Sequence, residues 1–314
     1  MKTLNEGAYE RVSEMIEKSH ELGISVIKTK AGSTVLDVGI GSNGSYEAGR
    51  LFAEACMGGF GEVSFGVYPE LSIPSVTVQV ANPAVACLAS QYAGWALKEG
   101  DFFALGSGPA RSLYCNEPLY SVLEYKETSP VAVLAIESSI LPPESLLDSI
   151  SRKCEVDPRD LYVLVAPSNS LAGAVQIVSR VVETGVHKLF ELGYDTTMLI
   201  HGYGICPIPP TPGDFMTAMG WTNDAVLYGG KVWFTLCDKD SAIDSIAEKL
   251  PSASSKDYGL PFSELFKRYN YDFYHVDPML FSPASVSINN IATGRWQNFG
   301  RENLELLRRE WFEQ

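Results

Sequence analysis

The stretch SLAGAVQIVSRVVETGVHKLFELG, residues 170–193, says most about how this chain folds. It consists mainly of Val, Ile, Leu, Ala, Gly and Phe and ends in a glycine typical of a helix C-terminus, so it predicts one long and largely buried helix. Four polar residues stand out along it: Gln176, Arg180, Glu183 and His187. At about 100° per residue they fall within a sector of roughly 60°, and Arg180 and Glu183 are close enough in sequence to touch.

Two interpretations of this polar stripe remain open from the pattern alone. In one, the stripe faces solvent and carries a surface ion pair worth less than about 1 kcal/mol. In the other, it lines a cleft, because a solvent face is normally wider and richer in Lys and Glu. A carboxylate beside a guanidinium in a partly dry cleft stays ionised, and it could position and deprotonate a water molecule.

Outward from this helix, the chain mixes predicted strands and helices without strict alternation and without a repeat. Residues 202–214, GYGICPIPPTPGD, are expected to form a rigid Pro/Gly loop. A domain boundary falls most readily near 165–169, and the lack of a flexible linker there predicts tightly packed domains. Strands are expected at 34–38, 62–67, 75–80, 120–125, 131–136, 161–165, 195–201 and 232–236. Helices are expected at 8–22, 46–57, 84–97, 144–153, 241–250 and 301–313.

A glycine-rich turn follows the first predicted buried strand, in VLDVGIGSNGSYEAG at residues 35–49. Gly39, Gly41 and Gly44 satisfy the G-x-G-x-x-G pattern of dinucleotide loops, and the sequence of this turn also resembles the methyl-donor loop of methyltransferases. A dinucleotide fold requires an acidic residue about 20 positions later at a strand end, whereas Glu70 lies between two prolines and past the strand. A methyltransferase or dehydrogenase that uses this loop is therefore the alternative function. A turn required by backbone geometry and a loop lining another ligand's pocket are the other interpretations.

Composition narrows the class of protein. The 314 residues include 38 acidic and 24 basic side chains, for a net charge of −14, which disfavours nucleic acid as a partner but not a small anionic substrate. No run reaches the roughly 18 apolar residues of a membrane span, and the mixed-charge N-terminus does not read as a signal peptide, so a cytoplasmic protein with no membrane partner is expected. Six cysteines and four histidines lack metal-ligand spacing, and we predict no metal site.

Six segments between residues 44 and 290 resemble, in order, the methenyltetrahydromethanopterin cyclohydrolases of methanogens and other one-carbon organisms. The opening VLDVGIGSNG is less typical of that family, which would make its likeness to a methyltransferase loop accidental. The segments are GSYEAGRLFAEACMGGFGEV (44–63), LGSGPARSL (105–113), APSNSLAGAVQIVSRVVETGVHKLFELGYD (166–195), GYGICPIPP (202–210), TAMGWTNDAVLYGGKV (217–232) and PSASSKDYGLPFSELFKRYNYDFYHVDPMLFSPASVSINN (251–290).

The resemblance implies a reaction that suits the polar stripe. A methenyl group bridging two nitrogens of reduced methanopterin is hydrolysed reversibly to the 5-formyl product and a proton, either toward methane formation or in C1 oxidation. The resemblance implies no metal, nucleotide or other cofactor. It assigns the catalytic pair to Arg180 and Glu183: Glu183 activates water, while Arg180 holds Glu183 and stabilises the oxygen charge of the tetrahedral adduct. A non-catalytic pterin-binding relative is a third possibility, and the presence of both residues argues against it.

Further residues are candidates for binding the pterin substrate, and most of them have a structural alternative as a cap, a turn or a surface group. Gln176 is a candidate for the pterin amide edge, Ser107 and Arg111 with Gly108 for a phosphate or carboxylate tail, and Tyr46 and Glu47 for the pocket rim. The remaining candidates are Ser168, Asn169, Ser170, Asn223, Asp224, Lys256 and Tyr258.

The fold class expected from the resemblance is α+β: two tightly packed mixed α/β domains with the active-site cleft between them. We place an N-terminal α/β domain at residues 1–165 and a C-terminal α/β domain carrying the catalytic helix at 166–314, with possible interleaving of the two. The resemblance also implies a homotrimer.

Overall fold

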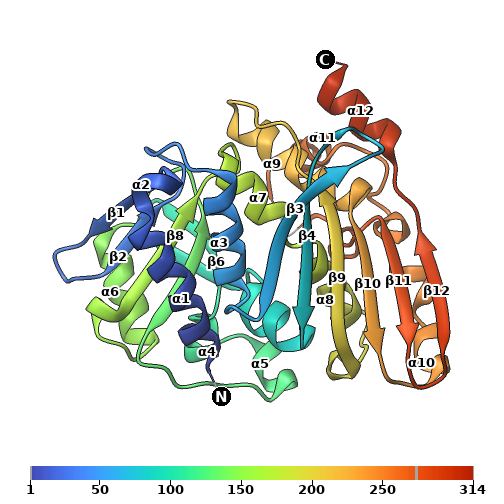
Figure 1. Cartoon of the computed structure of the whole chain (residues 1–314), viewed down its shortest axis with the longest axis horizontal. Helices are drawn as coiled ribbons and strands as arrows, with labels where there is room; N and C mark the ends of the chain where they lie inside the picture. The colour runs from blue at the N-terminus through green and yellow to red at the C-terminus, as the bar shows by residue number, and fades with distance from the viewer. Residues whose placement is uncertain (1, 273–274, 314) are drawn as a thin grey trace. The chain divides into compact units, whose positions relative to one another are not determined.

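The structure is a computed structural model that describes residues 2–272 and 275–313 (Figure 1). The chain divides into two compact units, one made of Met1–Glu62 and Val85–Gln176, the other of Val63–Ala84 and Ile177–Gln314. Each unit contains one six-stranded mixed sheet with its helices, which confirms the predicted α+β class. The assignment of 1–165 and 166–314 to separate domains stays a prediction.

The first unit is built on a sheet whose three central strands are parallel. β2, β8 and β7 run in the same direction, while β1, β6 and β5 pair antiparallel with their neighbours. The carboxyl ends of the three parallel strands therefore meet at one edge of the sheet. The strand order is β1 (Ser25–Lys28), β2 (Thr34–Asp37), β8 (Leu161–Ala166), β7 (Ala132–Glu137), β6 (Phe102–Ser107) and β5 (Trp95–Glu99).

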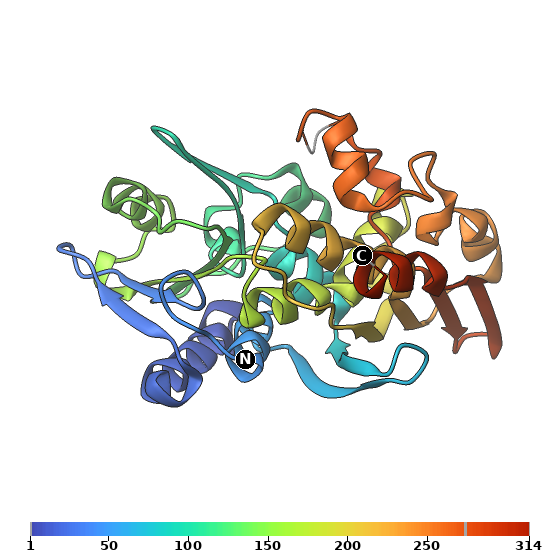
Figure 2. The ribbon, with the colours of Figure 1, turned by 90° about the horizontal axis from the view of Figure 1, so that it is seen from above.

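Helices cover both faces of this sheet (Figure 2). Alternate strand residues such as Leu36 and Leu164 pack with α1 (Leu4–Glu17) and α3 (Tyr46–Cys56) on one face. The intervening residues pack with α6 (Glu144–Lys153) on the other. Strands buried on both faces read as continuous apolar runs, which is why these were predictable. The unit also contains α2 (Ser19–Leu22), α4 (Arg111–Tyr114), α5 (Pro118–Leu123) and the beginning of α7 (Leu171–Val178).

The second unit is built on a mainly antiparallel sheet. β10 and β11 form a parallel pair, whereas β9 pairs antiparallel with β10 and β4, and β12 pairs antiparallel with β11. The helix α8 (Val181–Glu191) packs on β9, β10 and β4. The strand order is β12 (Arg295–Gly300), β11 (Ser285–Asn290), β10 (Lys231–Leu236), β9 (Leu199–Pro207), β4 (Ile73–Ala81) and β3 (Gly61–Tyr68). The other helices are α9 (Phe215–Asp224), α10 (Asp240–Asp244), α11 (Phe262–Arg268) and α12 (Leu304–Phe312).

Several predicted elements are wrong in instructive ways. Residues 120–125 are not a strand, because Pro118 starts the short helix α5 instead. The helix predicted at 84–97 ends at Gln91 as a π-helix (Ala84–Gln91), and β5 begins at Trp95. The helix at 241–250 is only α10 followed by a 3-10 turn. The glycine-rich stretch predicted as a loop from residue 202 is strand up to Pro207.

Within residues 2–272 and 275–313, no helix has both the length and the apolar character that a bilayer crossing requires.

Candidate active site

The predicted helix over 170–193 is in fact two helices. α7 ends at Val178, and α8 starts at Val181. At the break, the Arg180 amide donates to the Ile177 carbonyl at 3.0 Å, and the Thr184 amide restarts the regular ladder on the Arg180 carbonyl at 2.8 Å. This single tight turn interrupts the helical hydrogen-bond ladder without glycine or proline.

The break places Glu183 in the first turn of α8. The amide groups of a helix N-terminus point toward such a carboxylate, and the macrodipole stabilises its negative charge by about 0.3–1 kcal/mol. In an uninterrupted helix the same side chain would lie near the middle and receive no such stabilisation. The break therefore places a buried carboxylate where the helix N-terminus stabilises negative charge.

Arg180 and Glu183 form the ion pair that their spacing predicts. Arg180 Nη1 lies 3.5 Å from Glu183 Oε2, and the two side chains are 17% and 6% exposed. A carboxylate this buried does not belong to a solvent face, so the surface interpretation of the polar stripe is excluded. This distance is longer than that of a short hydrogen bond. Arg180 therefore positions Glu183 while the carboxylate can still accept other hydrogen bonds.

Two glycines of β9 fix the position of this first turn. A Cβ atom added at Gly202 would lie 2.6 Å from Val182 Cγ1, and one added at Gly204 would lie 2.6 Å from Val181 Cγ1. The start of α8 thus rests directly on the backbone of β9. The glycines that suggested a loop in the sequence instead let the helix approach the strand closely.

Gln176, on α7, is not the surface amide that its alternative interpretation required. Its side chain is buried, at 2% exposure. Its Oε1 has no hydrogen-bond partner among the described residues. A buried carbonyl oxygen without a donor is rare in native proteins and calls for an explanation, such as a ligand or a water that supplies the donor.

The glycine loop after β2 is closed by its own carboxylate. Asp37 accepts hydrogen bonds from the backbone amides of Gly39 (3.0 Å), Ile40 (2.7 Å) and Gly41 (2.8 Å) and from Ser42 Oγ (3.2 Å). Burial alone would raise the pKa of Asp37, but these hydrogen bonds bring it below its ordinary value. The amides that a phosphate-binding loop would offer are therefore already occupied.

Backbone geometry accounts for two of the loop's glycines. Gly44 has φ +62°, in the left-handed region. A Cβ atom at Gly39 would lie 2.5 Å from Cβ and Oγ of Ser170, so the loop and the residue before α7 are in close contact. The interpretation of the loop as a geometric turn fits this structure.

The three residues before α7 have different roles. Ser170 caps the helix: its Oγ accepts from the Gly173 amide at 2.9 Å and donates to the Pro167 carbonyl at 2.8 Å. Ser168 is fully buried, and its Oγ donates to Glu137 Oε1. Asn169, between them, is half-buried.

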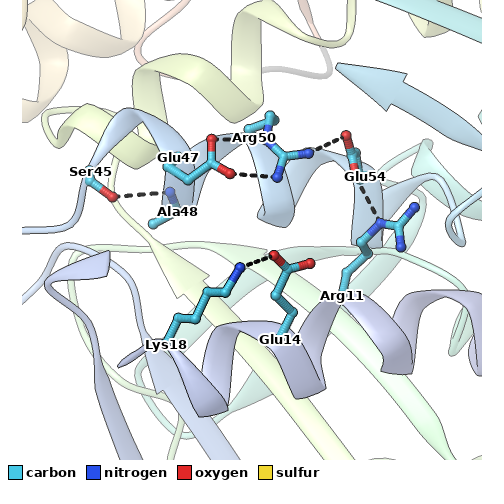
Figure 3. A network of polar contacts seen from close by, with 8 residues as sticks. All are labelled: Arg11, Glu14, Lys18, Ser45, Glu47, Ala48, Arg50 and Glu54. Atoms are coloured by element: carbon cyan, nitrogen blue, oxygen red, sulfur yellow. Dashed lines mark hydrogen bonds and ion pairs between the residues drawn. The ribbon is translucent and has the colours of Figure 1, made fainter. Parts of the chain in front are cut away.

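Tyr46 and Glu47 begin α3, as predicted, next to the glycine loop. Glu47 is half-exposed and is held by Arg50, whose Nε donates to Glu47 Oε2 at 2.9 Å (Figure 3). This hydrogen bond lowers the pKa of Glu47, while burial raises the pKa of Tyr46. Arg50 Nη1 also donates to Glu54 Oε1 at 2.7 Å, so Glu47 belongs to an ion-pair network along α3.

Ser107 and Arg111 are buried and engaged within the first unit. Ser107 Oγ donates to the Gln91 carbonyl at 2.6 Å. Arg111 is 1% exposed, donates to Glu117 through Nε at 2.9 Å, and donates through Nη1 to two backbone carbonyls at 3.1 Å. Tyr92 and Tyr120 cover its guanidinium. This geometry does not support Arg111 as a ligand of an anionic tail, because its donors hold the fold together.

Four candidates lie in the second unit. Asp224 is fully buried: its Oδ1 accepts from the Phe262 amide at 2.8 Å, and burial raises its pKa well above the usual carboxyl range. Its Oδ1 caps the start of α11, whereas its Oδ2 has no hydrogen-bond partner among the described residues. Asn223 donates to the Met219 carbonyl at 2.8 Å. Lys256 is exposed. The ring of Tyr258 packs against that of Tyr228, with centroids 5.1 Å apart and the ring planes tilted by 49°.

Comparison with known proteins adds to this geometry. The model of the family described as Cyclohydrolase (MCH) matches residues 3–311. This chain belongs to that cyclohydrolase family. It is 42% identical over 317 residues to the methenyltetrahydromethanopterin cyclohydrolase of Methanocaldococcus jannaschii and 43% identical over 314 residues to that of Methanothermobacter marburgensis, with 98% of each chain covered in both cases. The resemblance read from the sequence segments is thereby confirmed.

Sequence reasoning about this cyclohydrolase-family chain missed two polar groups. Glu137 ends strand β7 and is exposed, and its only sequence signal is that it follows an apolar run. Lys188 lies on α8 but is 1% exposed; its Nζ donates to Ser254 Oγ at 3.2 Å and to the Met279 carbonyl. A lysine on a helix reads as a surface residue, so nothing in the pattern indicated its burial.

Proposed function

We propose that this chain catalyses the reversible hydrolysis of the methenyl bridge of 5,10-methenyltetrahydromethanopterin to the 5-formyl derivative in one-carbon metabolism. Two observations support the proposal. Relatives that match along nearly their whole length carry the name of this activity. The buried pair of Arg180 and Glu183, at the start of α8, supplies the base that such a reaction requires.

The chemistry divides into water activation and ring opening. The methenyl carbon is part of an amidinium-like cation and is already electrophilic, so a resident metal or cofactor has no necessary role. Glu183 accepts a proton from water as the oxygen attacks that carbon, which gives a tetrahedral adduct. The bond from this carbon to one nitrogen then breaks. Of the two protons that water loses, one reaches the departing nitrogen and the other is released.

Arg180 positions the base and stabilises charge. It holds the Glu183 carboxylate, and its guanidinium stabilises the oxygen of the tetrahedral adduct as negative charge develops. Because α8 rests on the glycines of β9, the carboxylate has little freedom to move. Positioning of this kind contributes strongly to catalysis when the reacting atoms are within about 3–3.5 Å.

The Oε1 of Gln176, which has no hydrogen-bond donor among the described residues, supports a role in substrate binding. We propose that it accepts a hydrogen bond from a substrate N–H group, which would satisfy this buried atom. Ser168, Asn169, Tyr46 and Tyr258 remain proposed neighbours of the pterin. A homotrimer remains the proposed assembly, and light scattering of the purified protein would test it.

The alternative function, a methyltransferase or dehydrogenase acting through the glycine loop, is disfavoured. Asp37 occupies the backbone amides that would have to receive a phosphate or a methyl donor. Calorimetric titration with S-adenosylmethionine and with dinucleotides tests this directly: we expect no heat of binding, and tight binding of either would favour the alternative.

The proposed activity is tested by mixing the purified chain with methenyltetrahydromethanopterin and following the ultraviolet absorption of the methenyl chromophore. We expect its enzyme-dependent loss, unaffected by EDTA, with appearance of the 5-formyl product. A decay no faster than in buffer would refute the proposed function.

A further inference from the structure

Glu137 and Ser168 lie side by side at the carboxyl ends of neighbouring strands. Glu137 is the last residue of β7 and pairs in register with Ala166, the last residue of the parallel strand β8. Ser168 follows β8 and is fully buried, and its hydroxyl group donates a hydrogen bond to Glu137 Oε1. Although it receives this hydrogen bond, Glu137 is an exposed residue. The structure thus holds the carboxylate of an exposed residue against a buried hydroxyl group.

The connections that leave these two strands turn to opposite faces of the sheet. β7 leads to α6, whose Leu147 and Ile150 pack with Val165 on one face. β8 leads to α7, whose Ala172 packs with Leu51 of α3 on the other face. Figure 2 shows α6 and α3 on opposite sides of this sheet. Between β7 and β8 lies a topological switch point, which is where open α/β sheets bind their ligands, outside the carboxyl ends of the strands.

A fixed carboxylate at such a point selects for a particular ligand group. A carboxylate has two oxygens that can accept two parallel hydrogen bonds from adjacent N–H donors, as in its bidentate pairing with a guanidinium. The pyrimidine ring of a pterin presents this pattern, since its 2-amino group and its ring N3–H lie side by side. An exposed carboxylate contributes little to folding stability, so a buried serine that orients it is better explained by ligand binding than by stability.

We infer that Glu137 binds the amino-pyrimidine edge of the pterin through two hydrogen bonds, and that Ser168 positions Glu137 for this contact. The inference rests on the proposed function, because the pterin is the substrate that it names. It assigns Glu137 to recognition of the ring and not to the chemistry at the methenyl carbon. The expected signature of the Glu137→Gln variant is therefore a change in KM with little change in kcat.

The test compares Glu137→Gln with Glu99→Gln, a matched control at the exposed end of β5 in the same sheet. Loss of a charged hydrogen-bonding partner should raise the KM of Glu137→Gln by about 10- to 100-fold, with kcat within about threefold of the wild type. Glu99→Gln should match the wild type. Ser168→Ala should raise KM less than Glu137→Gln does. Unchanged melting temperatures show that the variants fold.

A substrate analogue with hydrogen in place of the 2-amino group separates recognition from a general disturbance of the site. The wild type should bind this analogue less tightly than the substrate, and Glu137→Gln should show most of its penalty only with the complete substrate. An equal penalty for both ligands, or a wild-type KM in Glu137→Gln, would overturn the inference. If the wild-type chain itself fails to consume the methenyl chromophore, the proposed function fails instead, so the two failures are distinguishable.

Discussion

Replacing Gly204 by alanine tests whether the close approach of α8 to β9 positions the catalytic carboxylate. The added Cβ atom would lie 2.6 Å from Val181 Cγ1 and 2.9 Å from Val182 Cγ2. Two carbon atoms pack at about 3.5–4.0 Å, so the first turn of α8 must move away by roughly 1 Å. The backbone at Gly204 does not need glycine for its φ angle, and the effect of the substitution is purely one of space.

The expected consequences differ in size for stability and activity. Overpacking of this kind costs about 1–3 kcal/mol of unfolding free energy. A displacement of about 1 Å at Glu183 should lower kcat by about 100-fold, because the base no longer reaches the attacking water correctly. Denaturant unfolding measures the first quantity, and the rate of chromophore loss measures the second.

Gly213→Ala is the matched control, since no heavy atom in the part of the chain that the structure describes lies within 4 Å of its added Cβ. It should be close to the wild type in both measurements. Combining Gly204→Ala with Val181→Ala removes the atom that the new methyl group meets and should restore part of the activity. Wild-type activity in Gly204→Ala alone would refute the claim that this contact positions the site.

Three further predictions concern buried charges. Glu127→Gln should lower the free energy of unfolding by about 1–3 kcal/mol, because the Glu127 carboxylate accepts hydrogen bonds from the Leu4 amide at 2.9 Å and the Asn5 amide at 3.0 Å. Glu124→Gln, at an exposed position, should leave the free energy of unfolding unchanged. Hydrogen bonds lower the pKa of Asp37 in the folded state, so the stability that the Asp37 carboxylate contributes is lost as the pH falls below 3.8, the ordinary pKa of an aspartate. Asp37→Asn should therefore flatten the acid limb of the curve of unfolding free energy against pH. Burial lowers the pKa of Lys188 from 10.5 to about 8, so the folded state binds fewer protons between these values. Stability should rise with pH there by up to about 1.4 kcal/mol per unit, and Lys188→Met should remove that rise.

The sequence predicted the elements whose pattern follows directly from burial. Strands β2, β7 and β8 are covered on both faces and read as apolar runs, and α6 has the helical period with prolines before it. The spacing of Arg180 and Glu183 was sufficient to predict that they meet.

What the pattern could not predict depends on tertiary contacts. No glycine or proline marks the break before α8, so the placement of Glu183 in a first turn was invisible. Gly202 and Gly204 read as loop residues because the sequence does not show the helix that needs their space. Arg111 read as a free positive charge, since its acceptors include backbone carbonyls that have no sequence signature. Glu137 stood out only after topology placed it at a switch point.

The role of Glu183 as the base is tested most directly by the single-turnover decay of the methenyl chromophore in Glu183→Gln. Glu191→Gln, an exposed position on the same helix, is the control. With both variants folded, as shown by their melting temperatures, we predict that Glu183→Gln slows the decay by about 100-fold or more while Glu191→Gln decays like the wild type. Equal decay rates in Glu183→Gln and the wild type would contradict the assignment of the base.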